Sequence, residues 1–164
     1  MFYGPAVHVV GVRVSTDSTV QPDETTLRTP VAKDGSTVAL VGTAVEVQFD
    51  RYLDPRTAIR KSYCLRSDTT PVGALDDCVQ GIGTAPVYDP VRRTLTLYLG
   101  EKLSADKLYT LTVFEPRVFE PDAITVGIRA FDGAALAENF SISFRTEPAP
   151  DPAAELESIA PLED

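Results

Sequence analysis

The sequence has little of the chemistry that most active sites need. Its 164 residues include no tryptophan, one histidine and two cysteines. A serine–histidine or cysteine–histidine mechanism would have to use His8, which lies in a valine-rich segment typical of a strand with one side facing solvent. One histidine and two cysteines also fall short of the four ligands of a usual zinc site. We therefore expect no enzymatic activity, no zinc centre and no cofactor.

Basic residues and long apolar runs are also scarce. The chain has 15 Lys and Arg against 24 Asp and Glu, a net charge of −9. This charge opposes any binding that depends on neutralising phosphates, so nucleic acid is not an expected partner. No apolar stretch approaches the roughly 20 residues that cross a bilayer, and the first residues lack a basic start followed by an apolar run. We expect no direct insertion into a membrane.

Proline and glycine, in contrast, interrupt the chain often. Thirteen prolines and ten glycines disfavour long helices, and the Val and Thr between them favour strands. Alternating apolar side chains predict strands at 5–14, 38–49, 63–65, 85–88, 94–99, 108–114, 124–128 and 140–144. About seven to nine short strands without alternating helices predict an all-β protein, an immunoglobulin-like β-sandwich of two antiparallel sheets.

The alternation carries finer information in the first two strands. In 5–14 it changes phase around Val10 and Gly11, which predicts a β-bulge. In 38–49, Val45, Val47 and Phe49 share one face, and Glu46 and Gln48 lie on the opposite one. We therefore expect 38–49 to be one half-buried strand with Glu46 on its polar side.

Turn signals separate the later strands. Asp54 and the proline after it suit the cap and first position of a helix, which predicts a helical turn or short helix over 55–61. The segment 89–93 contains Asp-Pro and predicts a turn. This turn joins 85–88 to 94–99, so these segments are expected to form a hairpin.

The chain divides into a body and a tail. We expect residues 1–146 to form the sandwich, with 15–35 as a polar, exposed connection that includes a short edge strand. Residues 147–164 form an acidic linker or tail rich in Pro and Ala. Six of its residues are acidic and none is basic: Glu147, Asp151, Glu155, Glu157, Glu163 and Asp164.

The order of motifs resembles the bacterial Ig-like domains that occur in tandem in S-layer proteins, large surface proteins and lipoproteins. Three segments carry the resemblance: 45–55 (VEVQFDRYLDP), 88–113 with its Tyr-Asp-Pro turn and Tyr-Thr-Leu-Thr-Val strand, and 128–146 with Phe-Asp-Gly and the closing strand. The resemblance implies an immunoglobulin-like fold, an extracytoplasmic location (cell surface, periplasm or secreted) and a spacer or adhesive function. The polar insertion after Val14 and the loop with both cysteines depart from the family pattern.

The two cysteines suggest a disulfide. Thirteen residues, mostly of a polar loop, separate Cys64 from Cys78. A bridge that closes this loop would stabilise the fold by about 3 kcal/mol in the chain-entropy model and would imply an oxidising compartment. The alternative is a pair of reduced, buried thiols.

Acidic pairs offer a weak calcium hypothesis. Asp76 and Asp77 precede Cys78, and Asp50 and Asp54 flank a turn. Their carboxylates are ligands of the type that calcium prefers, but neither pair has the spaced acidic loop with a glycine turn of a dedicated site. We expect turn and capping roles for these residues.

The function we expect is that of a spacer or protein-interaction module of a bacterial surface or secreted protein. Its candidate contact residues are Arg51, Tyr52, Arg117 and Phe119, where aromatic rings lie beside arginines. One alternative is a subunit of a larger surface assembly or filament that self-associates through an edge strand. Another is a carbohydrate-binding module, which the absence of tryptophan disfavours.

Overall fold

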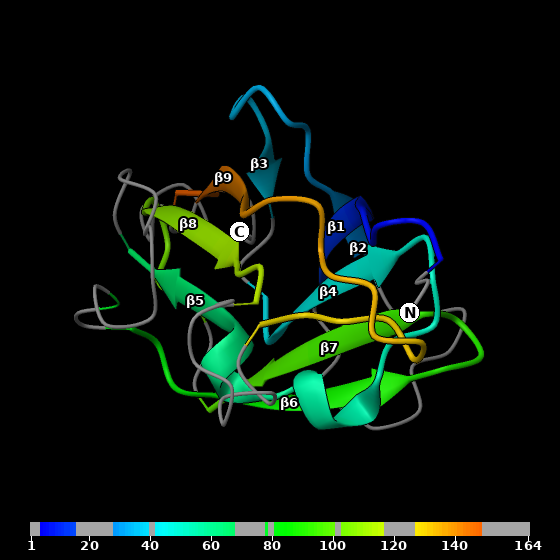
Figure 1. The fold of residues 1–164 in the computed structure, drawn as a ribbon. Coiled ribbons are helices and arrows are strands. Elements are labelled where there is room, and N and C mark those ends of the chain that lie inside the picture. The colour runs from blue at the N-terminus through cyan, green and yellow to red at the C-terminus, as the bar shows by residue number, and fades with distance from the viewer. Residues whose placement is uncertain are drawn as a thin grey trace, which may run out of the picture.

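Two sheets face each other in the computed structural model (Figure 1). It describes residues 4–15, 28–39, 42–67, 78, 81–100, 103–116 and 127–148. The first sheet has the order β2-β1-β4-β7-β6, made of Arg28–Pro30, Val9–Ser15, Ala44–Phe49, Thr94–Leu99 and Thr84–Asp89. The second has the order β3-β9-β8-β5, made of Val38–Ala39, Phe140–Thr146, Leu108–Val113 and Tyr63–Arg66. The predicted all-β sandwich is confirmed.

The strand order is that of an immunoglobulin-like sandwich. Strands β1-β4-β7-β6 and β5-β8-β9 match the four-stranded and three-stranded sheets of constant-type domains, and β3 pairs in parallel with β9 at one edge. Near the start of β8, the Tyr109 hydroxyl accepts a hydrogen bond from the Ser104 backbone N–H at 2.8 Å. This bond is similar to the tyrosine corner of immunoglobulin domains, where a tyrosine at the equivalent strand bonds a few residues upstream.

The core forms where the alternating apolar side chains of both sheets meet. The first sheet contributes β4 and β7, and the second contributes β8 and β9. Among the most deeply buried residues are Val45, Val47, Phe49, Leu95, Leu97, Leu111 and Phe144, each at most 1% exposed. Tyr109 stacks on Phe144 with ring centroids 5.8 Å apart. The period-two pattern therefore identified the buried face correctly.

Local predictions for turns and irregularities hold. The β1–β4 register shifts between Val9 and Gly11, which confirms the bulge. β6 and β7 form the expected hairpin. After β4, two 3-10 turns, η1 (Pro55–Thr57) and η2 (Arg60–Ser62), provide the helical turn expected over 55–61. Asp54 caps η1 by accepting the Arg56 N–H at 3.0 Å. In the described residues no helix is longer than these two turns, so none has the length and apolarity to cross a membrane.

The prediction of one strand over 38–49 is wrong. β3 ends at Ala39 and lies in the four-stranded sheet, whereas β4 begins at Ala44 and lies in the five-stranded sheet. Between them, a Cβ on Gly42 would lie 2.5 Å from a Val14 side-chain carbon, so the chain passes too close to β1 for a larger residue. Side-chain alternation continues across such a change of sheet, and the pattern alone does not reveal it.

Glu46 lies on the face opposite the core, as expected, but it is buried there. Its side chain is only 2% exposed, although it lies on the outer face of the five-stranded sheet. Arg28 from β2 donates Nε–H to both carboxylate oxygens at 3.0 and 3.1 Å, and Arg13 from β1 places its Nε 3.4 Å away. The two arginines cover the carboxylate. The short edge strand expected within 15–35 thus exists as β2, and it contributes one of them.

Prolines occupy both outer edges of the five-stranded sheet. Successive residues of a strand direct their backbone polar groups to alternate sides. In β2, the Val31 N–H bonds back to β1, so Pro30 faces away from the sheet. In β7, Leu99 bonds toward β4, so the even-numbered residues of β7 bond to β6. Pro86 lies opposite the odd-numbered Leu97, and its nitrogen therefore faces outward. Because proline has no N–H, neither edge offers a regular ladder to an added strand.

The described chain begins and ends at opposite ends of the sandwich. At the end that we call N-terminal, Gly4 donates its N–H to the Asp132 carboxylate at 2.9 Å. At the C-terminal end, Glu147 follows β9 and donates its N–H to the Ala39 carbonyl at 2.9 Å. In Figure 1 the first described residues, in blue, and the end of β9, in orange, lie on opposite sides. β7 runs the full distance, which at about 3.3 Å per residue is roughly 20 Å.

Of the expected strand 124–128, only 127 and 128 are described, and neither is in a strand. Arg129 and Ala130 instead form isolated bridges to 135 and 53. The described part of the tail, Glu147 and Pro148, has no regular secondary structure. The division into a body and a tail stays a prediction.

Candidate interaction surface

Two exposed aromatic side chains lie together at the N-terminal end. Tyr52 is 53% exposed and Phe131 is 66% exposed. The Phe131 N–H donates to the Tyr52 carbonyl at 3.0 Å, so the two residues are backbone neighbours. A guanidinium lies over each ring, that of Arg51 over Phe131 and that of Arg93 over Tyr52, 5.7 and 6.0 Å from the ring centroids. We call Arg51, Tyr52, Arg93 and Phe131 the aromatic patch.

The backbone that carries Tyr52 and Phe131 is tied to the core. After β4 the chain pairs with 129–131, through a bridge between Leu53 and Ala130. The Leu53 N–H also donates to the Tyr88 hydroxyl at 2.8 Å, which anchors it to β6. Leu53 and Ala130 are at most 2% exposed. The exposed rings therefore extend from a rigid, buried base.

Arg51 forms a bidentate ion pair with Asp132. Its guanidinium donates to the two Asp132 carboxylate oxygens at 3.1 and 2.8 Å, and to the Pro5 carbonyl at 2.6 Å. The hydrogen bonds from Arg51 are the main cause that lowers the pKa of Asp132 far below its usual range, and the N–H groups of Ala134 and Gly4 add to the effect. Both charges are satisfied within the module, so the patch carries no free charge at this position.

Arg93 is positioned by the hairpin turn. It adopts a left-handed backbone with φ of 52° at the last turn position before β7. This conformation ends the turn and directs Nη1–H to the Asp50 carbonyl at 3.1 Å. The Arg93 carbonyl accepts the Phe49 N–H at 2.9 Å, which fixes the turn to β4. One of these bonds holds the Arg93 guanidinium and the other holds its main chain.

The single histidine lies next to the patch. His8 Nδ1 is 3.0 Å from Asp50 Oδ2, and the His8 N–H donates to Oδ1 at 2.8 Å. The imidazole side chain is 59% exposed, as expected for a surface position. The pair fastens the chain before β1 to the end of β4. In the described ranges, no group of three or more His, Cys, Asp or Glu side chains gathers where a metal ion would bind.

Cys64 and Cys78 form a disulfide, with Cα atoms 5.9 Å apart, which confirms the predicted bridge. Cys64 lies in β5, and its sulfur packs with Phe114 outside the main core. A Cβ on Gly81 would lie 2.9 Å from the Cys78 Sγ, so only glycine lets the chain pass this close to the bridge. The disulfide links β5 to Cys78, which precedes β6 in the chain.

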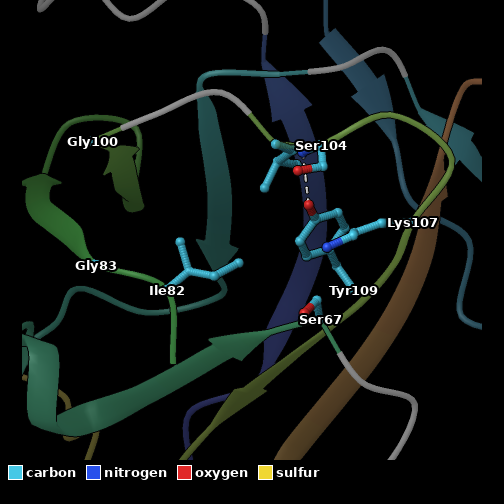
Figure 2. A pocket seen from close by; sticks show the side chains of 8 residues that line it. Ser67, Ile82, Gly83, Gly100, Ser104, Lys107 and Tyr109 are labelled. Carbon is cyan, nitrogen blue, oxygen red and sulfur yellow. Dashed lines mark hydrogen bonds between the residues drawn. The ribbon is translucent and has the colours of Figure 1, made fainter. Parts of the chain in front are cut away.

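A pocket opens at the C-terminal end between the two sheets, with a volume of about 390 Å³. Its lining residues come from the ends of β5 to β8: Ser67, Ile82, Gly83, Gly100, Leu103, Ser104, Lys107 and Tyr109. Figure 2 shows Ile82 across the space from Tyr109, with Lys107 beside the tyrosine ring. Its lining is mixed: Ile82 is partly buried, Leu103 and Tyr109 are at most 4% exposed, and Ser67, Ser104 and Lys107 supply polar groups.

The structure brings some of the predicted site residues together. Arg51 and Tyr52 both belong to the aromatic patch. The other two predicted contact residues, Arg117 and Phe119, and the calcium candidates Asp76 and Asp77 lie outside the described residues. Sequence reasoning missed the other two residues of the patch, Arg93 and Phe131. Its one visible signal was an aromatic residue in a turn, the Phe-Asp-Gly at 131–133.

Of the second calcium pair, Asp54 has the capping role that we expected, whereas the Asp50 carboxylate bonds His8 instead of a turn or cap. Asp54 caps η1, and its carboxylate also pairs with the exposed Arg56 at 2.8 Å. The hydrogen bonds from Arg56 lower the pKa of Asp54. The Asp50 side chain bonds His8.

Comparisons with known proteins identify the fold. No protein-family model matches the chain, and no curated protein sequence does. Among solved structures, domains 1–6 of the surface layer protein SbsC align over 90% of this chain, with a TM-score of 0.51 and 16% identity. The N-terminal part of the bacterial S-layer protein SbsC aligns over the same share, with a TM-score of 0.51 and 17% identity. CopC from Methylosinus trichosporium OB3b covers 71% of the chain and 86% of its own length, with a TM-score of 0.47 and 14% identity.

The chain spans 14% and 25% of the two S-layer structures. At these identities the likeness concerns the fold. The chain is therefore similar in fold to a part of a bacterial S-layer protein.

Proposed function

We propose that this chain is a non-catalytic structural module of an extracytoplasmic bacterial protein, used as a spacer or interaction domain. The observation that carries the proposal is the course of the chain, which enters the sandwich at one end and leaves at the other. Modules that are joined end to end in this way form a row along one axis. S-layer proteins, whose domains this fold resembles, provide the setting in which such a module acts.

The disulfide supports the location. Such bridges persist in oxidising compartments and are rare in the reducing cytosol. Cys64 is 2% exposed and the bridge lies against Phe114, so it is built into the packing of the second sheet. A covalent link between residues 64 and 78 also stabilises the fold, because it restricts the unfolded chain.

The aromatic patch supports an interaction role. Tyrosine and arginine are enriched among the residues that dominate binding energy at protein interfaces. Here two rings are exposed and held by stacked guanidiniums, so little conformational freedom is lost when a partner covers them. The edge prolines Pro30 and Pro86 disfavour association by strand addition at the five-stranded sheet and leave the ends of the module as its contact surfaces.

The test is the location and redox state of the protein in its native cells. Antibody against the chain should label intact cells or the secreted or periplasmic fraction, and Cys64 and Cys78 should be protected from alkylation until a reductant is added. A protein found in the cytosol with both thiols free would refute the proposal. So would the turnover of a substrate that purified chain catalyses and heat-denatured chain does not.

A further inference from the structure

We propose that Cys78 is a site of reversible modification by small, uncharged thiols, which exchange with the disulfide while the module stays folded. The inference goes beyond the proposed function, because it gives the bridge a chemical role besides stability. The two sulfurs of the bridge lie in different surroundings. This difference selects the sulfur that an incoming thiol reaches.

Cys64 is closed to an attacking thiol. It is 2% exposed and lies within β5, where it pairs with Thr112 of β8. Thr112 is 1% exposed, and Phe114, which packs against Cys64, is 4% exposed. A thiolate attacks a disulfide only where it has access to one of the two sulfurs. Burial therefore blocks attack on the Cys64 sulfur.

Cys78 is open on one side. It is only partly buried, and it lines a hollow of about 390 Å³ beside the bridge. Cys64 borders this hollow too, but with little of its surface, whereas Gly81 borders it and is exposed. A Cβ at position 81 would lie 2.9 Å from the Cys78 Sγ, so glycine leaves this side of the sulfur without a side chain over it. The hollow is the path by which a small thiol reaches Cys78.

The exchange replaces one bond between sulfurs by another. The thiolate of the small thiol attacks Cys78 Sγ and forms a mixed disulfide there. The bond between Cys78 and Cys64 breaks, and its electron pair stays on the Cys64 sulfur, which takes a proton from solvent. One disulfide bond forms and one breaks, so the step needs no oxidant. The apolar surroundings of Cys64 disfavour its thiolate and slow the step, but they do not open Cys64 itself to attack.

The location of the bridge lets the module stay folded when the bridge opens. Among the described residues, the main core cluster includes neither cysteine. Cys64 and Phe114 form a small separate cluster, and Cys78 packs against it. Exchange therefore disturbs this small cluster and leaves the contacts between the two sheets in place.

Two further contacts keep the sulfurs close to each other. The Ile82 N–H donates to the Leu65 carbonyl at 2.7 Å, and the hydroxyl groups of Tyr63 and Thr84 share a hydrogen bond. Both contacts join β5 to the chain that follows the second cysteine, and neither depends on the bridge. The freed Cys64 thiol thus stays near the mixed disulfide. It expels the small thiol and restores the bridge when the concentration of that thiol falls.

Brief treatment of the wild-type chain with 2-mercaptoethanol tests the choice of sulfur. This thiol carries no charged group besides its attacking sulfur, which limits the influence of Arg60 beside the hollow and of Asp76 and Asp77 before Cys78. After an acid quench, mass spectrometry of peptides should locate the mixed disulfide on Cys78, with Cys64 as a free thiol. An adduct on Cys64, equal adducts on both cysteines, or no adduct under conditions that modify the urea-unfolded chain would overturn the inference.

Two matched variants measure the access to each sulfur separately. Cys64→Ala leaves Cys78 as the only thiol, and Cys78→Ala leaves Cys64, so both variants lack the same bridge. Each is mixed with the uncharged reagent 4,4′-dithiodipyridine, and circular dichroism verifies that each is folded. Cys78 should react at least about 100-fold faster than Cys64, since a buried thiol reacts only when the fold opens locally. Equal rates in the two folded variants would contradict the inference.

The dependence on urea separates exchange in the folded module from exchange through unfolding. Below the unfolding transition, the rate constant of the wild-type reaction with 2-mercaptoethanol should stay nearly constant. A reaction that requires unfolding accelerates by about 5-fold or more for each molar step in urea, and this result would refute exchange in the folded state. None of these measurements depends on where the protein is located, so the proposed function is tested separately.

Discussion

Glu46 gives the sharpest test of how the N-terminal strands are held. Its carboxylate is 2% exposed, accepts two hydrogen bonds from Arg28 at 3.0 and 3.1 Å, and lies 3.4 Å from Arg13 Nε. Replacing Glu46 by alanine leaves two guanidiniums facing each other across the space of the lost side chain. Replacing it by glutamine keeps the shape and one acceptor oxygen but removes the negative charge.

The structure sets the size of the effect. Removing one partner of a fully buried ion pair costs about 3–5 kcal/mol, whereas an exposed pair contributes about 0–1 kcal/mol. The Arg28 and Arg13 side chains are 21% and 30% exposed, so water compensates part of their charge when the carboxylate is gone. We expect Glu46→Ala to lower the free energy of unfolding by about 3 kcal/mol and Glu46→Gln by about 2 kcal/mol.

Urea denaturation with the disulfide intact measures both values. For a chain of this size, about 3 kcal/mol corresponds to a melting temperature lower by roughly 6–12 °C. The difference between wild type and Glu46→Gln should persist at about 1 M salt, since salt screens buried pairs much less than exposed ones. Variants within about 0.5 kcal/mol of wild type, the usual range for surface substitutions, would refute the reasoning. They would mean that β2 and its arginine contribute no stability through this carboxylate.

Three further predictions concern other parts of the module. Replacing Cys64 and Cys78 by alanine should lower the free energy of unfolding in urea by about 3 kcal/mol, the loop-closure contribution of the bridge. Because Arg51 lowers the folded-state pKa of Asp132 below its ordinary 3.8, this carboxylate stabilises the fold above that pH and its contribution is lost as the pH falls further. Asp132→Asn should therefore flatten the acid side of a plot of melting temperature against pH. Gly127→Ala should cost about 1–3 kcal/mol, since its φ is +89° and a Cβ would lie 2.4 Å from neighbouring backbone.

Each of these predictions has a matched control. Gly100→Ala adds a Cβ that meets nothing within 4 Å, so its stability should stay equal or rise by up to about 1 kcal/mol. Asp106→Asn alters a carboxylate that is 64% exposed and pairs weakly with Arg145 at 3.3 Å, and it should leave the acid side of the curve unchanged. Reductant should destabilise wild type and have no effect on the double alanine variant. Equal effects in a variant and its control would contradict the corresponding prediction.

The sequence predicted what depends on local pattern. Period-two alternation found the core face of β4, β7 and β9, and Asp-Pro pairs found the capped turn after Asp54 and the hairpin turn before Arg93. These features arise from side-chain direction and backbone preference within a few residues. The disulfide also followed from spacing and residue type, because only two cysteines exist to pair.

The rest depends on contacts between distant segments. Alternation placed Glu46 opposite the core, but only the fold shows that arginines from β1 and β2 cover it. Alternation likewise carries no information on which sheet a strand joins, so the change of sheet between Ala39 and Ala44 was missed. The aromatic patch combines residues 80 positions apart, and no local pattern relates Arg51 to Phe131.

The parallel pairings at the two ends affect how the module responds to tension. Val7 bonds in parallel to the segment around Leu136, and β3 bonds in parallel to the last residues of β9. If the chain is pulled through Gly4 and Pro148, the force runs along these strands and across their hydrogen bonds. The bonds then bear load together in shear and do not open one after another like a zipper. Stretching should meet its main resistance at these two short ladders, before any strand of the core is extracted.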